Sequence, residues 1–297
     1  MKTKIIQLFK NITVDSLTKN LVKLFKYLFI SSAAVATSQV NAATIQVASS
    51  NKTATNISND YVFNIASKDL ILTSESFETI NVGSVVDTGI TSDIRLITHS
   101  SDEGVATFNI GSVVLDAGTT PGVVNFTDTN SSGTNVVVNI SGLFETLGVH
   151  NVISSDQGGD AMTVNYDGNV IVGAAMIFNA SGGSVTGSIN GVFSGATISF
   201  GASLDLGTTR ATATFDRAGA QAITGTIEGT ADAGGHLVIA QNNSSGVATF
   251  NSALGGINHL ASTTINANSA AVFAAGNDGI TLTNNGTMTA NAGVIQY

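Results

Sequence analysis

Short runs in which apolar residues alternate with Thr or Asn dominate this chain from about residue 101 to its end, with Gly, Asn and Ser between them. Successive side chains of a β-strand point to opposite faces, so Ala211, Ala213 and Phe215 are expected to face a core. Thr212 and Thr214, which lie between them, are expected to face water. A run of about four to six residues cannot bury its inner face alone and must stack on neighbours. The pattern therefore predicts an all-β fold of many stacked short strands.

The expected strands are distributed over residues 105–290. They are placed at 105–110, 123–127, 136–140, 162–166, 170–172, 196–200, 211–215, 236–240, 247–251, 263–266, 271–273, 279–282 and 287–290. The longest apolar run, residues 170–178, is too short to cross a bilayer as a helix, which needs about 20 residues. It is interpreted as a pair of buried strands.

Internal repeats indicate how these strands stack. The hexapeptide Gly-Val-Ala-Thr-Phe-Asn occurs at 104–109 and again at 246–251, and Thr-Gly-x-Ile occurs at 186–189 and 224–227. Self-similarity of this kind is typical of solenoids, in which each repeat contacts only its neighbours. The prediction is a right-handed parallel β-helix, also called a β-solenoid.

The spacing of phenylalanines gives an expected coil length. Phe108, Phe126 and Phe144 follow one another at the same interval, which suggests coils of about 18 to 22 residues. If that interval is one coil, the three rings occupy equivalent positions and stack as a ladder inside the core.

A β-sandwich built of hairpins is the alternative fold. Tight hairpins favour two-residue Asn-Gly or Asp-Gly turns between longer strands. The sequence has four such pairs, at 167–168, 190–191, 278–279 and 285–286, which is few for so many strands.

Composition and charge limit the class of protein. Charged residues make up 10% of the chain and hydrophobic residues 43%, which disfavours intrinsic disorder. Thr, Val, Ile and Phe suit strands, and Gly and Asn suit turns. Beyond residue 42 there are 5 basic against 19 acidic residues, a balance of about −14. Such a surface repels nucleic acid and anionic membranes, so neither is an expected ligand.

Residues 1–42 have the pattern of a signal peptide. Six lysines precede residue 27, an apolar stretch follows, and Val40-Asn41-Ala42 places small residues at the −3 and −1 positions of a cleavage site before Ala43. The alternative for this segment is a retained amphipathic helix. The expected organisation is thus a signal peptide at 1–42, an N-terminal cap of irregular β-structure at 43–100, and a β-solenoid repeat region at 101–297.

In composition and repeat pattern, residues 100–297 resemble the passenger region of rickettsial cell-surface antigens, which are autotransporter adhesins. The segments that carry the resemblance are 222–229, 236–240, 246–251 and 281–288, which alternate Thr-Gly-x-Ile turns with Gly-x-Ala-Thr-Phe-Asn strands. The resemblance implies surface display, host-cell adhesion and antigenicity. Such adhesins end in a translocator barrel, for which this chain has no room. It is therefore expected to be a truncated or split gene product, or one piece of a longer protein.

No catalytic, cofactor-binding or metal-binding residues are predicted. His99, His150, His236 and His259 are too scattered for metal-ligand spacing, and Gly276–Leu282 resembles half of a single calcium-binding repeat. A carbohydrate-active β-helix enzyme would need paired carboxylates on adjacent coils. The close pairs are Asp102/Glu103 and Asp156/Asp160, and the nearest cations, Arg210 and Arg217, are distant in sequence. Sequons at Asn125, Asn139 and Asn285 are expected by chance in a chain so rich in Asn and Thr.

The predicted function is that of an exported, non-enzymatic surface protein that acts in adhesion or surface structure. The expected location is the cell surface, the outer membrane or the extracellular space, or the periplasm if no translocator is available. Expected partners are a host-cell receptor or glycan and a separately encoded translocator barrel, with no cofactor, nucleic acid or small-molecule substrate. A polysaccharide-active β-helix enzyme and a non-functional remnant of a split adhesin gene are the alternatives.

Overall fold

The computed structural model describes most of the chain after residue 43. The described residues are 44–47, 52–53, 59–63, 69–74, 79–87, 94–100, 104–115, 123–128, 134–154, 161–180, 188–207, 210–231, 233–241, 246–275, 277–278, 282–284, 286–290 and 295–296. They contain strands and no helix, and all of them belong to one unit, Ala43–Tyr297. The predicted signal peptide at 1–42 lies outside the described residues.

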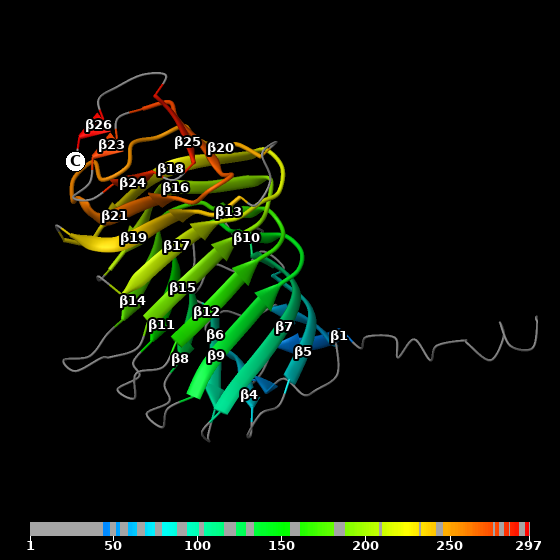
Figure 1. Ribbon diagram of the computed structural model, residues 1–297. Coiled ribbons are helices and arrows are strands. Elements are labelled where there is room, and N and C mark those ends of the chain that lie inside the picture. The colour runs from blue at the N-terminus through cyan, green and yellow to red at the C-terminus, as the bar shows by residue number, and fades with distance from the viewer. Residues whose placement is uncertain are drawn as a thin grey trace, which may run out of the picture. The chain divides into compact units, whose positions relative to one another are not determined.

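The strands form three parallel ladders, in which each strand pairs with its counterpart one coil later (Figure 1). The strands of the first ladder are, in order, β5 (Thr79–Asp87), β7 (Gly104–Leu115), β9 (Thr134–Ile140), β12 (Ala161–Tyr166), β15 (Ser188–Phe193), β17 (Ala211–Phe215), β19 (Gly234–Ile239), β21 (Leu260–Ile265) and β24 (Leu282–Asn284).

The second ladder includes the second halves of β5 and β7, because these two long strands bend from the first face to the second. Its strands are β1 (Thr44–Val47), β3 (Asn59–Phe63), β10 (Phe144–Thr146), β13 (Val170–Val172), β16 (Thr197–Leu206), β18 (Gln221–Gly229), β20 (Ala248–Phe250), β22 (Ala270–Phe273) and β25 (Thr287–Ala290).

The third ladder closes each coil. Its strands are β2 (Lys52–Thr53), β4 (Asp69–Ser74), β6 (Ile94–Ser100), β8 (Val124–Asp128), β11 (His150–Ser154) and β14 (Met176–Ala180), followed by the second halves of β16 and β18. A separate pair joins β23 (Asn277–Asp278) to β26 (Ile295–Gln296). Residues 43–100, expected to be an N-terminal cap, contribute β1 to β6 to these same ladders.

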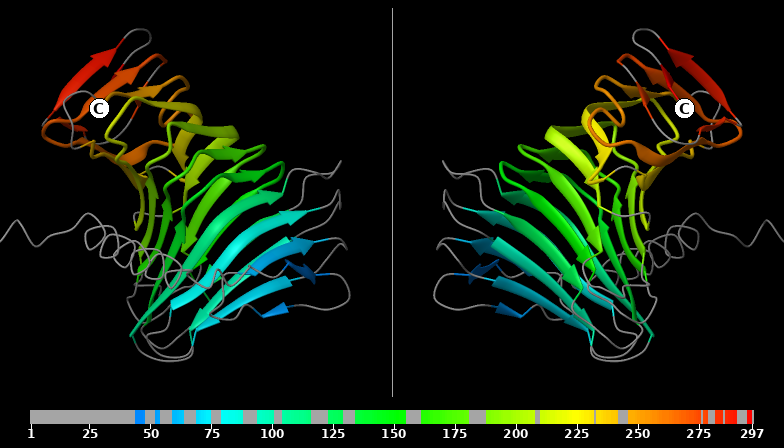
Figure 2. Two further views of the ribbon diagram at one scale, coloured as in Figure 1. Left: turned by 90° about the vertical axis from the view of Figure 1, so that its right-hand side faces the viewer. Right: turned by 90° about the vertical axis from the view of Figure 1, so that its left-hand side faces the viewer.

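This arrangement is a parallel β-solenoid, as the sequence predicted. A sandwich of hairpins would have antiparallel neighbours, whereas the ladders are parallel. Figure 2 shows the same stack of strands from two sides. The alternation of residues 211–215 is confirmed, because Ala211, Ala213 and Phe215 are buried and the two threonines between them are not. The apolar run 170–178 forms the buried strands β13 and β14, also as expected.

The expected coil length is too short for most of the stack, although the step from Ile189 to Ala211 is 22 residues. Four asparagines, from Asn81 to Asn165, hydrogen-bond across consecutive coils and are separated by 28, 30 and 26 residues rather than about 18 to 22. Phe108 lies in the first ladder, Phe126 in the third and Phe144 in the second. Their equal spacing therefore spans part of a coil each time, and the three rings do not occupy equivalent positions.

The repeated hexapeptide also changes face. Its first copy begins β7, where Phe108 pairs with Ile80 and Val138 in the first ladder. Its second copy lies in β20, where Phe250 pairs with Phe273 in the second ladder. The same six residues serve both faces because a strand needs only the inward–outward alternation that they supply.

The aromatic ladder that does exist uses other residues. Tyr166, Phe193 and Phe215 are paired in register on consecutive coils, and all three are buried. Their ring centroids are 5.1 Å apart at both steps, with interplanar angles of 5° and 17°. Each stacked ring adds roughly 2 to 3 kcal/mol of burial free energy.

Glycines stack where the first ladder turns into the second. A Cβ on Gly142 would lie 2.5 Å from the carbonyl oxygen of Gly111, and one on Gly111 would lie 2.8 Å from that of Gly83. Gly168 and Gly195 continue the column, each against the glycine before it. Consecutive coils approach too closely at this corner for any side chain, which explains why glycine recurs there.

Among the described residues, no helix is long and apolar enough to cross a bilayer.

Candidate functional site: a polar groove along an asparagine ladder

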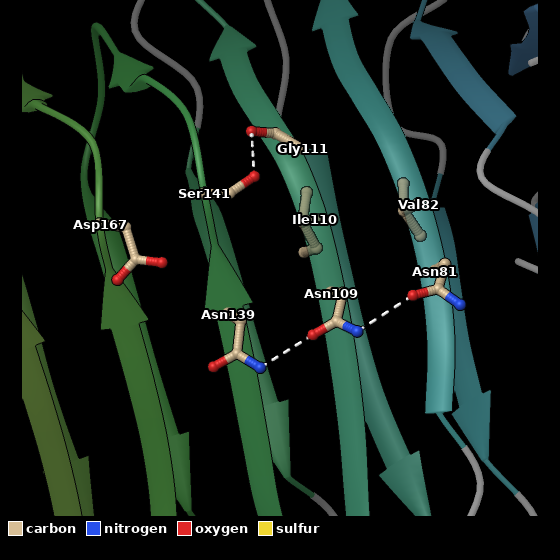
Figure 3. A pocket seen from close by; sticks show the side chains of 8 residues that line it. All are labelled: Asn81, Val82, Asn109, Ile110, Gly111, Asn139, Ser141 and Asp167. Carbon is tan, nitrogen blue, oxygen red and sulfur yellow. Dashed lines mark hydrogen bonds between the residues drawn. The ribbon is translucent and has the colours of Figure 1, made fainter. Parts of the chain in front are cut away.

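The outer face of the first ladder carries a column of asparagines. Asn81, Asn109, Asn139 and Asn165 occupy one register position on β5, β7, β9 and β12. Asn109, Asn139 and Asn165 each donate a hydrogen bond from Nδ2 to Oδ1 of the preceding asparagine, at 3.0, 2.8 and 2.7 Å. Figure 3 shows the first two of these bonds. The column ends at β15, where Val192 takes the next position.

A groove of about 400 Å³ lies along this column. Its lining residues are Asn81, Val82, Asn109, Ile110, Gly111, Asn139, Ser141 and Asp167. The side chains of Val82 and Ile110 are buried in the core, so their backbone forms that part of the floor. The groove runs beside the glycine corner, because Gly111 brings no side chain to its wall.

The end of the groove is formed by two exposed side chains. Ser141 donates its hydroxyl to the carbonyl oxygen of Gly111 at 3.3 Å. Asp167 lies one coil further along, in the turn between β12 and β13 (Figure 3). Among the described residues, no hydrogen bond or ion pair engages its carboxylate, so both oxygens can accept hydrogen bonds from a ligand.

Sequence reasoning did not select this site. In the sequence, Asn139 stands out only as a sequon and Asp167 only as part of an Asp-Gly turn. The signal was nevertheless present, since each ladder asparagine lies between two inward-facing apolar residues, as in Phe108-Asn109-Ile110 and Val138-Asn139-Ile140. The sequon residues Asn125 and Asn139 both lie in ladders, with Asn151 donating to Asn125 at 2.7 Å. Asn285 lies outside the described residues.

The four histidines remain separate. His150 is fully buried, His236 Nδ1 lies 2.7 Å from the hydroxyl oxygen of Ser262, and His99 and His259 are in other coils. In the part of the chain that the structure describes, no three His, Cys, Asp or Glu side chains come together where they could hold a metal ion.

The sequence candidates for an enzyme are only partly described. Asp102, Glu103, Asp156 and Asp160 lie outside the described residues, as does most of the segment 276–282. Arg217 donates from Nη1 to the backbone oxygen of Ser194 at 3.0 Å, so it holds two coils together.

His150 is a titratable group buried in the core. Its Nδ1 lies 3.0 Å from the backbone oxygen of Val124, and its Nε2 lies 2.7 Å from the hydroxyl oxygen of Tyr166. Burial lowers the pKa of His150 to about 4 and raises the pKa of Tyr166. Both groups are therefore neutral at physiological pH and serve packing.

Comparisons with protein families, curated proteins and solved structures give no match.

Proposed function

We propose that this chain is an exported, non-enzymatic surface protein whose solenoid displays a polar binding face for adhesion. The observation that carries the proposal is the asparagine-lined groove on the outside of a closely packed parallel stack. Consecutive coils are about 4.8 Å apart in such a stack, so the side chains of Asn81, Asn109 and Asn139 are presented at fixed intervals. Fixed, repeated hydrogen-bonding groups favour recognition of an extended ligand.

The chemistry of the groove supports binding over hydrolysis. Glycoside hydrolysis ordinarily uses two carboxyl groups that flank the scissile bond. Among the described residues that line the groove, Asp167 is the one that carries a carboxylate. The other polar groups are amides and a hydroxyl, which bind without exchanging protons at neutral pH.

Export is supported by the leader. The basic start, the apolar stretch and the small residues Val40 and Ala42 fit processing by a signal peptidase, which would release a chain that begins at Ala43. The resemblance to autotransporter passengers in composition and repeat pattern favours the cell surface as the destination, with a separately encoded translocator barrel as the partner. Without a translocator, the processed chain would stay in the periplasm.

Two measurements test the proposal. Intact-mass analysis of the chain from the exported fraction should give an N-terminus at Ala43, and a product that retains Met1 in the cytoplasm would contradict export. Beads coated with the exported chain should then adhere to cultured animal cells more than beads coated with the same chain after thermal unfolding. Equal adherence of both kinds of bead would contradict the adhesive function.

A further inference from the structure

We propose that the groove along Asn81, Asn109 and Asn139 binds a neutral, uncharged oligosaccharide. This inference rests on the proposed adhesive function and names its ligand class. It follows from three properties of the groove: its hydrogen-bonding capacity, its charge and its repeated geometry.

The ladder uses half of the hydrogen-bonding capacity of the Asn109 and Asn139 amides. A carboxamide has two N–H donors and an oxygen with two lone pairs. Asn109 donates one N–H to Asn81 and accepts one bond from Asn139, and Asn139 does the same with its neighbours. One donor and one lone pair therefore remain on the amides of Asn109 and Asn139. Sugar hydroxyls both donate and accept hydrogen bonds, so a pair of adjacent hydroxyls matches this supply.

Asp167 and Ser141 complete the set of polar groups. The Asp167 carboxylate accepts hydrogen bonds only, and a charge-assisted bond from a hydroxyl is stronger than a neutral one. Ser141 donates to Gly111, and its oxygen retains the capacity to accept. Both side chains are exposed at the same end of the groove, where a terminal sugar can be held from two sides.

Charge selects against acidic glycans. The described residues that line the groove include one carboxylate and no Lys or Arg. Residues 96–209, which supply all of the groove beyond β5, contain no Lys or Arg at all. A sialylated or sulfated glycan would meet Asp167 without a cation to offset the repulsion, whereas a neutral glycan would not.

The geometry favours a chain of sugars bound weakly and many times. The amides repeat at about 4.8 Å along the stack, so a linear oligosaccharide can meet several of them in succession. Each hydrogen bond replaces one to water, and its net gain is small. Adhesion through this groove therefore depends on many displayed copies acting together.

The test uses the full exported chain coated on beads and glycan probes immobilised at equal density. The probes are the neutral tetrasaccharides lacto-N-neotetraose and maltotetraose, sialylated lacto-N-neotetraose, and a heparin tetrasaccharide. We expect at least one neutral probe to retain the beads, with retention by the sialylated and sulfated probes about tenfold lower. Retention by the charged probes equal to or above that by the neutral ones would overturn the inference, as would no retention by any probe.

Variants connect the binding to this groove. Asp167→Ala removes the strongest acceptor and Ser141→Leu fills the groove, and both positions are exposed, so the fold should persist with an unchanged melting temperature. Each should reduce retention by about tenfold or more. Asn251→Ala changes an exposed asparagine of another face and should retain full binding. Variants that bind as well as the unchanged chain would place the sugar elsewhere and refute the proposal.

The two proposals fail in different ways. The coated beads could adhere to cells without binding neutral glycans, and the two groove variants could adhere to cells as well as the unchanged chain. In that case the adhesive function stands and the ligand class is wrong. If folded beads adhere no better than unfolded ones, the adhesive function itself is wrong.

Discussion

The Nε2 atom of His150 lies 2.7 Å from the hydroxyl oxygen of Tyr166, inside the core, and the two residues come from neighbouring coils. The other ring nitrogen, Nδ1, lies 3.0 Å from the backbone oxygen of Val124. A carbonyl can only accept, so Nδ1 carries the proton and Nε2 accepts from Tyr166. Phe126 and Phe144 pack on the imidazole with ring centroids at 4.8 and 4.4 Å. The ring is thus held neutral in one tautomer.

Because of this pair, we expect the folded protein to lose stability in mild acid. The folded-state pKa of His150 is lowered to about 4, below the unfolded value of 6.5, by burial. The unfolded chain therefore takes up a proton first as the pH falls. The contribution of His150 to the free energy of unfolding is fully present above pH 6.5. It is lost between pH 6.5 and about 4, by roughly 3 kcal/mol in all. Urea unfolding at pH 7.5, 5.5 and 4.5 measures this loss.

A double variant isolates the contribution of His150. His150→Leu together with Tyr166→Phe removes both partners, so no buried polar group of the pair is left unsatisfied. This variant should lose less stability than the unchanged chain between pH 7.5 and 4.5. Equal losses in both proteins would assign the acid sensitivity to other groups.

Removing a ring of the aromatic stack should weaken its neighbouring coils. Phe193 lies between Tyr166 and Phe215 and also contacts Phe178 and Phe200. Phe193→Ala should lower the free energy of unfolding by about 3 to 5 kcal/mol because a cavity remains. In a solenoid the loss is felt mainly nearby, so limited proteolysis should increase around residues 160–220 before residues 79–115. Simultaneous loss of protection along the whole chain would contradict a solenoid of loosely coupled coils.

The glycine corner should tolerate no side chain. Gly142→Ala would place a Cβ 2.5 Å from the carbonyl oxygen of Gly111, so two coils must separate locally. We expect a loss of about 1 to 3 kcal/mol in the free energy of unfolding, measured by chemical denaturation. Gly256→Ala is the matched control, since its Cβ would meet nothing closer than 3.7 Å, and it should change stability little. Equal effects of both substitutions would mean that the corner can relax.

The asparagine ladder should contribute to stability as well as to binding. Asn109→Ala removes two side-chain hydrogen bonds, one to Asn81 and one from Asn139, and should lower the free energy of unfolding by about 1 to 3 kcal/mol. Asn251→Ala, at an exposed position directly after the second-ladder strand β20, should leave the free energy of unfolding nearly unchanged. Thermal unfolding of the two variants side by side checks this difference. If both are neutral, the ladder is a consequence of the stack and not a support for it.

The sequence by itself determined which side of each strand faces the core. The period of two along a strand is a local property, so Ala211, Ala213 and Phe215 could be assigned inward without knowing their neighbours. The same local pattern, with its short runs and few tight-turn pairs, was enough to favour a parallel solenoid over a sandwich. The asparagine column could also have been suspected, because an Asn between two inward apolar residues recurs at Asn81 and Asn109.

Only the tertiary structure decided the length of the coils and which strands became neighbours. Hydrogen bonds between parallel strands join backbone groups, which are alike at every residue, so they fix no register of their own. Register depends on which inward side chains fill the core together and on where the glycine corner lets coils approach. Phe108, Phe126 and Phe144 therefore lie on three faces despite their equal spacing. Tyr166, Phe193 and Phe215 are unequally spaced in the sequence, and yet their rings stack. The groove arises in the same way, because Asn139 and Asp167 become neighbours only when the coils close.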